Sequence, residues 1–263
     1  MFGALVRLVE MKLGDESIEL AQFLAPRGRP IPVDSRSNDL WFQHIAIIVS
    51  DMDRAYAILR QNKVEFASSA PQRLPDWNKN GIKAFYFKDP DEHPVETLWF
   101  PEGKGDLKWH RLSDRIFLGI DHTAIAVSDT DASLKFYRDL LGLCVASESE
   151  NYGTEQEHLN NVLRSPRKDH VPARFGRTGI ELLEYLSPRD GRSFPLDEHT
   201  NDIVHRHTIL LVQDVDKTAA GLRNARARFV SSGVVANHMK EIEFSKAFIV
   251  RDPDGHPVEI AAQ

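Results

Sequence analysis

The sequence predicts an α+β protein built from one repeated unit of strands and a helix. The first observation is an internal repeat: His44 and His207 stand 163 positions apart (207 − 44), and so do Glu96 and Glu259 (259 − 96). A constant offset without a gap over this length indicates duplication of a structural unit. The second observation is that each of these histidines opens a β-branched apolar stretch, and a helix-like spacing of apolar residues follows it.

A shorter repeat lies within the longer one. Three stretches share a His on an apolar strand, an Asp-rich turn and a helix: FQHIAIIVSDMDRA from Phe42, GIDHTAIAVSDTDA from Gly119 and HRHTILLVQDVDKT from His205. Each unit then ends on a strand carrying a Glu: VETLWF from Val95, IELLEY from Ile180 and VEIAAQ from Val258. A fourth such ending, IELAQF from Ile18, has no beginning before it. The chain therefore contains three full units and the tail of another.

Each full unit is predicted to run as strand, helix and further strands. An Asp stands where it can cap the helix, and an Asp-Pro-Asp turn at 89–91 and 252–254 precedes the last strand. The helix-capping positions are Asp51, Asp129 and Asp214. Two stretches rich in Pro, Arg and Asp, 27–39 and 189–202, are interpreted as linkers within pairs of units, and 100–117 as the linker between pairs.

Composition excludes several classes of function. The chain has 263 residues and a net charge of −6, so bulk charge does not indicate a nucleic-acid-binding surface. Its single cysteine, Cys144, rules out a disulfide framework and thiolate zinc motifs. No apolar run reaches the roughly 20 residues that a membrane span needs. We therefore expect a soluble cytoplasmic protein with a small-molecule substrate and neither a nucleic-acid nor a membrane partner.

The repeated His and Glu are candidate metal ligands. Taken singly, a His on an apolar strand is usually a core residue, and a Glu at a strand end is usually solvated. Here both return at equivalent places in units that otherwise diverge. Strand alternation places His122 on one face with Ala124 and Ala126, which leave room for a ligand. One His and one Glu from each of two units make a nitrogen–oxygen site suited to Zn²⁺, Ni²⁺, Co²⁺, Mn²⁺ or Fe²⁺.

Paired units of this kind resemble the vicinal oxygen chelate (VOC) superfamily, which includes glyoxalases, extradiol dioxygenases and bleomycin resistance proteins. The most specific pieces are DHTAIAVSDTDASLKFYRDLLGL from Asp121 and FIVRDPDGHPVEI from Phe248, and the resemblance covers nearly the whole chain. It implies tandem βαβββ modules paired into half-open barrels, each around one divalent metal. By position, the implied ligands are His122, Glu181, His207 and Glu259.

Chain order then predicts two pairs of modules. Residues 1–105 would form an N-terminal pair with an incomplete first module and a second module at about 40–103. Residues 116–263 would form a C-terminal pair with modules at about 116–190 and 202–263. The N-terminal pair would hold a degenerate second site of Glu19, His44 and Glu96.

The incomplete first module has three explanations: a shortened form of a longer protein, a second copy of the chain covering the open edge in a homodimer, or a remnant packed on the other modules. The first is favoured, because the strands before and around Ile18 look like parts of an intact module.

The resemblance implies glyoxalase- or epimerase-like isomerase or lyase chemistry on a small oxygenated substrate, through a metal-bound enediolate. Glu181 and Glu259 would be ligands and candidate bases. His205 shares a strand face with His207, and Tyr185 shares one with Glu181, so we include both as candidate catalytic residues.

Two alternatives stay open. An extradiol-type Fe²⁺ dioxygenase would use His122, His207 and Glu259 as its two-His-one-carboxylate set, but Ile249 stands where that group's signature has a Tyr. In the N-terminal pair, Tyr86 occupies the matching place. The other alternative is a binding or resistance module without turnover. The sequence identifies neither the substrate nor the metal.

Overall fold

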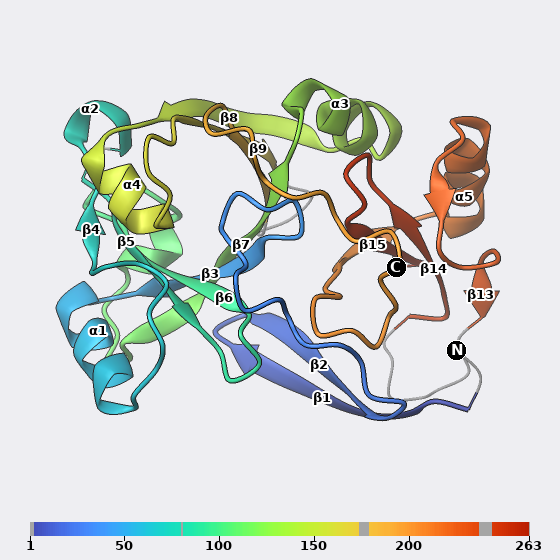
Figure 1. Cartoon of the computed structure of the whole chain (residues 1–263), viewed down its shortest axis with the longest axis horizontal. Coiled ribbons are helices and arrows are strands. Elements are labelled where there is room, and N and C mark those ends of the chain that lie inside the picture. The colour runs from blue at the N-terminus through green and yellow to red at the C-terminus, as the bar shows by residue number, and fades with distance from the viewer. Residues whose placement is uncertain (1–2, 80, 174–178, 237–243, 263) are drawn as a thin grey trace.

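The computed structural model describes residues 3–79, 81–173, 179–236 and 244–262. Within these residues the strands form three sheets (Figure 1). A hairpin consists of β1 (Leu5–Leu13) and β2 (Glu16–Ala25). An eight-stranded sheet has the order β4-β5-β6-β3-β7-β10-β9-β8, and a further sheet has the order β11-β15-β14-β12 with β13 paired to β14. Together with the short helices, this is the α+β fold that the repeat predicts.

The strands follow the repeated units, which are numbered in chain order with the incomplete unit at the N-terminal end as the first. The second unit holds β3 (Gln43–Val49), β4 (Gln72–Arg73), β5 (Lys83–Lys88) and β6 (Pro94–Trp99). The third holds β7 (Phe117–Val127), β8 (Cys144–Asn151), β9 (Arg167–Ala173) and β10 (Gly179–Tyr185). The fourth holds β11 (Thr208–Val212), β12 (Arg228–Phe229), β13 (Val235–Ala236), β14 (Lys246–Arg251) and β15 (Pro257–Ala262).

Each unit's first strand leads into a helix that an aspartate caps. Asp51, Asp129 and Asp214 each accept a hydrogen bond from the backbone N–H three residues later, as predicted. The helices are α1 (Met52–Gln61), α3 (Thr130–Leu134) continuing as the π-helix η2 (Lys135–Leu140), and α5 (Val215–Asn224). Shorter helices are α2 (Asp76–Lys79), η1 (Leu107–His110) and α4 (Thr154–Asn160). None of the helices in the described ranges is long and apolar enough to cross a membrane.

The eight-stranded sheet joins the second unit to the third. Their first strands, β3 and β7, pair antiparallel at its centre, and in each unit the last strand pairs parallel with the first. The two units are therefore related by an approximate two-fold axis through the β3–β7 pair. This grouping corrects the one expected from chain order, which placed the second and third units in different pairs.

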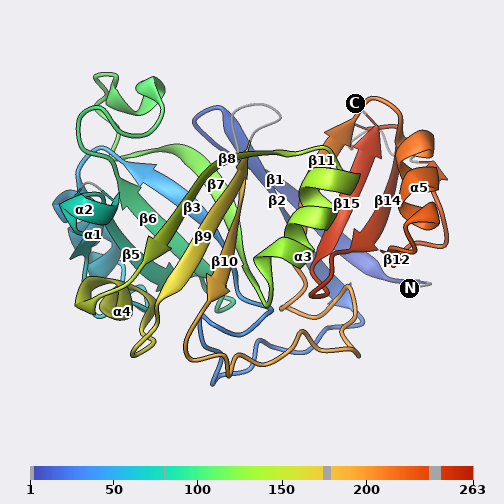
Figure 2. The same cartoon turned by 90° about the horizontal axis from the view of Figure 1, so that it is seen from above.

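The third and fourth units share a core on the faces of their sheets opposite to His122, Glu181 and Glu259. Ile125 of β7 and Leu182 of β10 belong to one buried cluster with Val258 and Ile260 of β15. Figure 2 shows α3 lying between the two sheets, and its Leu134 belongs to the same cluster. Neighbouring residues on a strand point to opposite faces. Because Val258 and Ile260 flank Glu259, the polar faces of the two sheets point away from each other.

In the described residues the β1–β2 hairpin forms a sheet of its own and contacts β7 near its turn (Figure 1). The Glu16 carboxylate pairs with Lys108 and accepts a hydrogen bond from the backbone N–H of Ile120 at 3.1 Å. Several apolar side chains of the hairpin are exposed, among them Leu5 and Met11. Within the described ranges, β11 of the fourth unit pairs with β15 alone.

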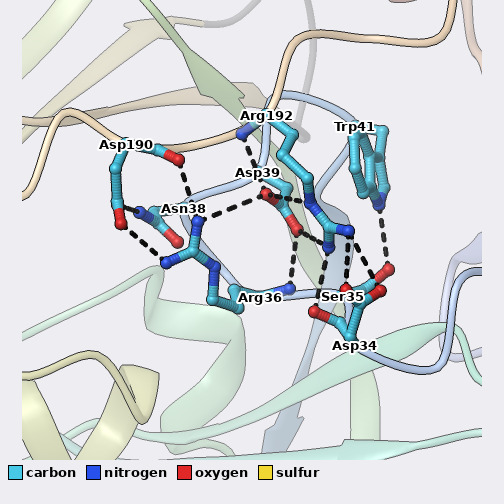
Figure 3. A network of polar contacts seen from close by, with 8 residues as sticks. All are labelled: Asp34, Ser35, Arg36, Asn38, Asp39, Trp41, Asp190 and Arg192. Atoms are coloured by element: carbon cyan, nitrogen blue, oxygen red, sulfur yellow. Dashed lines mark hydrogen bonds and ion pairs between the residues drawn. The ribbon is translucent and has the colours of Figure 1, made fainter.

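The linkers at residues 27–39 and 189–202 cross, and ion pairs with hydrogen bonds join them. Arg192 of the second linker donates to the buried Asp39 of the first, from its backbone N–H at 2.9 Å and from its guanidinium at 2.7 Å (Figure 3). The guanidinium also lies over the ring of Trp41, 4.7 Å from its centre. By the repeat offset of 163, Arg29 is the counterpart of Arg192 and Asp202 of Asp39. Arg29 donates to Asp202 in the same way, at 2.7 Å from both its backbone N–H and its guanidinium. We call these two contacts the clasp.

The clasp requires glycine where the linkers touch. A Cβ on Gly191 would overlap the carbonyl oxygen of Asn38, and a Cβ on its counterpart Gly28 would overlap that of Asn201. The backbones approach this closely because neither glycine has a side chain.

Candidate metal centre

Four side chains converge at the centre of the eight-stranded sheet. Across the β3–β7 pair, His44 lies opposite Ala124, whose other neighbour is Glu181 on β10. In the symmetric row, His122 lies opposite Ala46, whose other neighbour is Glu96 on β6. Each row thus places a His and a Glu on either side of an alanine. The small alanine side chains leave the space into which the four longer ones reach.

The functional atoms of these side chains lie close together. His44 Nε2 is 3.2 Å from Glu96 Oε2, and His122 Nε2 is 3.2 Å from Glu181 Oε2. These two contacts link the two rows, and within one row His122 Nε2 is 3.7 Å from Glu96 Oε2. His44, His122 and Glu181 each offer a ligand atom within 4.8 Å of the other two. Three side chains therefore lie close enough together to share one ion, and the Glu96 carboxylate lies beside both histidines.

The buried polar atoms of the site fit a cation. His44 is 1% exposed, and Glu96 and Glu181 are 5% and 8% exposed. Among the described residues, both ring nitrogens of His44 and the Nε2 of His122 are buried without a well-directed hydrogen bond. Buried polar groups without partners are costly and rare. A divalent cation of the Zn²⁺ or Fe²⁺ type would take the histidine lone pairs and both carboxylates.

The surroundings shift the pKa values of His44 and His122 in opposite directions. Burial lowers the pKa of His44, although the Glu96 carboxylate opposes this. Burial also disfavours a charge on His122, but hydrogen bonds to Asp121 and Glu181 outweigh it and raise the pKa of His122 well above its usual value. Tyr86, whose ring lies edge-on to His44 at 5.0 Å, has its pKa raised by burial and by Glu96. A cation among the ligands would compete with the proton on His122.

The expected ligands of the fourth unit lie elsewhere. His207 Nε2 is 2.9 Å from Glu259 Oε2, beside β11 and β15 of the other sheet. His205 lies next to His207, with ring nitrogens 3.4 Å apart, and its Nδ1 pairs with the buried Glu198. These residues form a chain of polar contacts that is separate from the four-residue cluster. Ile209 stands on β11 where the other first strands carry Ala46 and Ala124.

These positions correct the predicted ligand set. His122 and Glu181 do share a site, but their partners are His44 and Glu96, not His207 and Glu259. The physical reason is the core shared by the third and fourth units, which turns their ligand faces away from each other.

The predicted second site is divided as well. Glu19 is an exposed residue of the hairpin, where it lies opposite Glu10 of β1. His44 and Glu96 belong to the eight-stranded sheet, with which the hairpin forms no strand pairing in the described part of the chain. Glu19 therefore stands on a different sheet from the two residues it was expected to join.

Tyr185 and His205, the other candidate catalytic residues, are both held by partners. The Tyr185 side chain is buried, and its hydroxyl donates to Ser37 Oγ at 3.1 Å. His205 belongs to the His207 group.

The sequence patterns did not predict that His44 lies beside His122. A signal was present in the linkers: Arg29 and Asp39 in the first have counterparts Arg192 and Asp202 in the second, and such complementary charges indicate that the two linkers contact each other.

Comparison with known proteins identifies the family of this chain. The family model described as the Glyoxalase/Bleomycin resistance protein/Dioxygenase superfamily matches residues 3–97 and 119–260. The chain belongs to this superfamily. A lactoylglutathione lyase of Haemophilus influenzae is 26% identical over 141 residues, which are 52% of this chain and 87% of that protein.

Solved structures of the superfamily share the fold. Glyoxalase I from Zea mays superposes with a TM-score of 0.62 at 15% identity, covering 97% of this chain and 78% of that one. A mutant of the same enzyme gives a TM-score of 0.63 at 16% identity, covering 98% and 80%. At this identity the likeness shows the fold and leaves the chemistry to the site.

Proposed function

We propose that the protein is a divalent-metal-dependent isomerase or lyase of the glyoxalase type, acting on a small oxygenated substrate. The observation that carries the proposal is the convergence of His44, Glu96, His122 and Glu181, in which the buried Nε2 atoms of both histidines face carboxylate oxygens at 3.2 Å. The match to a lactoylglutathione lyase supports the same class of reaction.

In this proposal the four side chains hold the cation. When bound, a divalent metal acts as a Lewis acid on substrate oxygens and stabilises the negative charge that develops there. Glu96 and Glu181 reach the centre from opposite sides, so one carboxylate can take a proton from the substrate while the other stays in place. His44, Glu96 and Glu181 are buried and the His122 side chain is 12% exposed, so the site limits the access of water to the transferred proton.

An Fe²⁺ dioxygenase is the second candidate, and one observation favours it. Among the described residues, two histidines and one carboxylate, His44, His122 and Glu181, have possible ligand atoms that all lie within 4.8 Å of one another, and such a set binds iron in many non-haem oxygenases. Tyr86 beside His44 stands where the sequence pattern of that class has a Tyr, but the His that the pattern places before it is absent. The position of Glu96, within 3.7 Å of both histidines, favours the four-ligand alternative.

The test begins with the metal content of protein purified without added metal. Protein loaded in turn with Zn²⁺, Ni²⁺, Co²⁺, Mn²⁺ and Fe²⁺ is then assayed for isomerisation of a hemithioacetal and, in air, for cleavage of a catechol. The proposal expects the first activity. Catechol cleavage with Fe²⁺ alone would favour the second candidate. Stoichiometric metal with neither activity would favour a binding module, and absence of metal binding would contradict both enzymes.

A further inference from the structure

The far side of His122 is held by a carboxylate. Its Nδ1 lies 3.0 Å from Oδ2 of Asp121, whereas its Nε2 faces Glu181 and Glu96. The other oxygen of Asp121 accepts a hydrogen bond from the indole N–H of Trp109, also at 3.0 Å. The carboxylate is therefore fixed between a ligand histidine and a buried indole.

Trp109 is itself firmly placed. It lies in η1, within the segment that joins the second unit to the third, and it is 8% exposed. Its ring packs on the backbone at Gly119, where a Cβ would come within 2.8 Å of ring carbons. Lys108 lies over the ring at 4.0 Å from its centre and pairs with Glu16 of the hairpin turn. The segment that joins the second unit to the third therefore contacts the proposed metal centre through Trp109 and Asp121.

His44 has no such support. In the described structure its Nδ1 is buried without a hydrogen-bond partner. The residue before it is Gln43, whose amide points to Thr123 Oγ1 at 3.4 Å. The two-fold symmetry of the four ligands therefore breaks at this point, where Asp121 stands in the third unit and Gln43 in the second.

We propose that Asp121, held by Trp109, is a positioning residue that fixes the ring of His122 with Nε2 directed at the metal. The inference rests on the proposed metal centre but not on the reaction it catalyses. A carboxylate on the outer nitrogen of a ligand histidine fixes the ring orientation and tautomer and makes the inner nitrogen a stronger ligand. Loss of such a partner typically weakens metal binding about 10–100-fold.

The experiment measures metal affinity in the full chain. Metal-stripped protein is titrated with Zn²⁺ and with Co²⁺ against a competing chelator, and no substrate is needed. Asp121→Ala should weaken binding about 10–100-fold. Asp121→Asn should weaken it less, because the amide oxygen can still accept from Nδ1–H. The Co²⁺ absorption spectrum should change in Asp121→Ala, since the ring of His122 is no longer fixed.

The indole N–H provides a matched pair of variants. Trp109→Phe removes the donor to Asp121 and should give an affinity between those of the unaltered protein and Asp121→Ala. Trp41→Phe removes another buried indole N–H, which donates to Ser35 Oγ at 3.1 Å away from the ligands, and should leave affinity unchanged. Thermal melting of each variant identifies any that are unfolded.

The outcomes separate the inference from the proposed function. If folded Asp121→Ala binds both metals within about twofold of the unaltered protein, the inference is wrong and the metal centre stands. If Trp41→Phe weakens binding as much as Trp109→Phe, the effect is general loss of packing and the positioning role is also wrong. If the unaltered protein binds no metal, the proposed function and this inference fall together.

Discussion

Arg192 and Asp39 are 153 residues apart in the chain, and the guanidinium and the backbone N–H of Arg192 both donate to this one buried carboxylate. Asp39 lies five residues before His44, so a linker of the C-terminal half fixes the approach to a ligand strand of the N-terminal half. The clasp therefore fixes the backbone shortly before β3.

Removal of the Arg192 side chain should destabilise the protein. Arg192→Ala leaves the Asp39 carboxylate buried and without its main partner, which we expect to lower the unfolding free energy by about 2 kcal/mol. The loss is not larger because solvent screens the exposed part of the guanidinium. Urea unfolding measures this. Arg138→Ala removes an exposed pair with Asp139 and serves as the control, with no expected change. Equal effects of the two variants would show that the Arg192–Asp39 contact stabilises the protein no more than an exposed ion pair does.

Alanine should have opposite effects at two glycines. Gly191→Ala places a methyl group on the Asn38 carbonyl, so the linkers must separate and the protein should lose stability. Gly221 lies inside α5, and apart from the nearby backbone of α5 and its chain neighbours no atom lies within 4 Å of the place its methyl group would take. Gly221→Ala should therefore raise the unfolding free energy by up to about 1 kcal/mol. Melting temperatures of both variants decide the matter, and a neutral Gly191→Ala would contradict the close crossing.

Acid should weaken the second half of the clasp. Burial alone would raise the pKa of Asp202, but hydrogen bonds from the Arg29 side chain and from the backbone N–H groups of Arg29 and His199 lower it from 3.8 to about 2. A carboxylate with a depressed folded-state pKa stabilises the protein above its unfolded pKa, and this contribution is lost as pH falls. Stability should therefore decline between about pH 4 and pH 2.

Asp202→Asn tests that assignment. The variant should be less stable than the unaltered protein at pH 6, and the difference in melting temperature should shrink as pH is lowered through the same window. A difference that stays constant from pH 6 to pH 2 would assign the acid sensitivity to other carboxylates.

Metal binding should depend on the second unit and not on the fourth. His44→Ala should abolish binding of Zn²⁺ at the four-residue centre, because it removes a ligand, whereas His207→Ala should leave that affinity unchanged. Glu96→Ala and Glu259→Ala form a second pair with the same expectation. Metal analysis by mass spectrometry after dialysis is sufficient. The reverse ranking would restore the ligand set expected from chain order.

The sequence predicted the units well, because their signals are local. The capping aspartates, the strand alternation around His122 and the closing strands with Glu96, Glu181 and Glu259 all depend on short-range patterns. The structure confirms the α+β fold and these elements. The sequence also singled out one His and one Glu from each unit, and their role as ligands stays a prediction.

The pairing of units was not readable from those patterns. Any two units can present a His and a Glu, and periodicity does not state which first strands meet edge to edge. The decision lies in long-range contacts: the core of Ile125 and Leu182 with Ile260, and the clasp between the linkers. Asp121 was overlooked for the same reason, since its partner Trp109 lies in a segment that the sequence presents only as a linker.

The clasp can form only late in synthesis, because both contacts need residues of the C-terminal half. Chains emerge from the ribosome N-terminal end first, and domains generally fold as units in that order. All four ligands of the proposed centre lie between His44 and Glu181, so the eight-stranded sheet can pair before Arg192 has been made. The clasp joins residues more than 150 positions apart, and contacts of this sequence separation close slowly. The four side chains of the proposed centre can therefore come together in a nascent chain before its two linkers are joined.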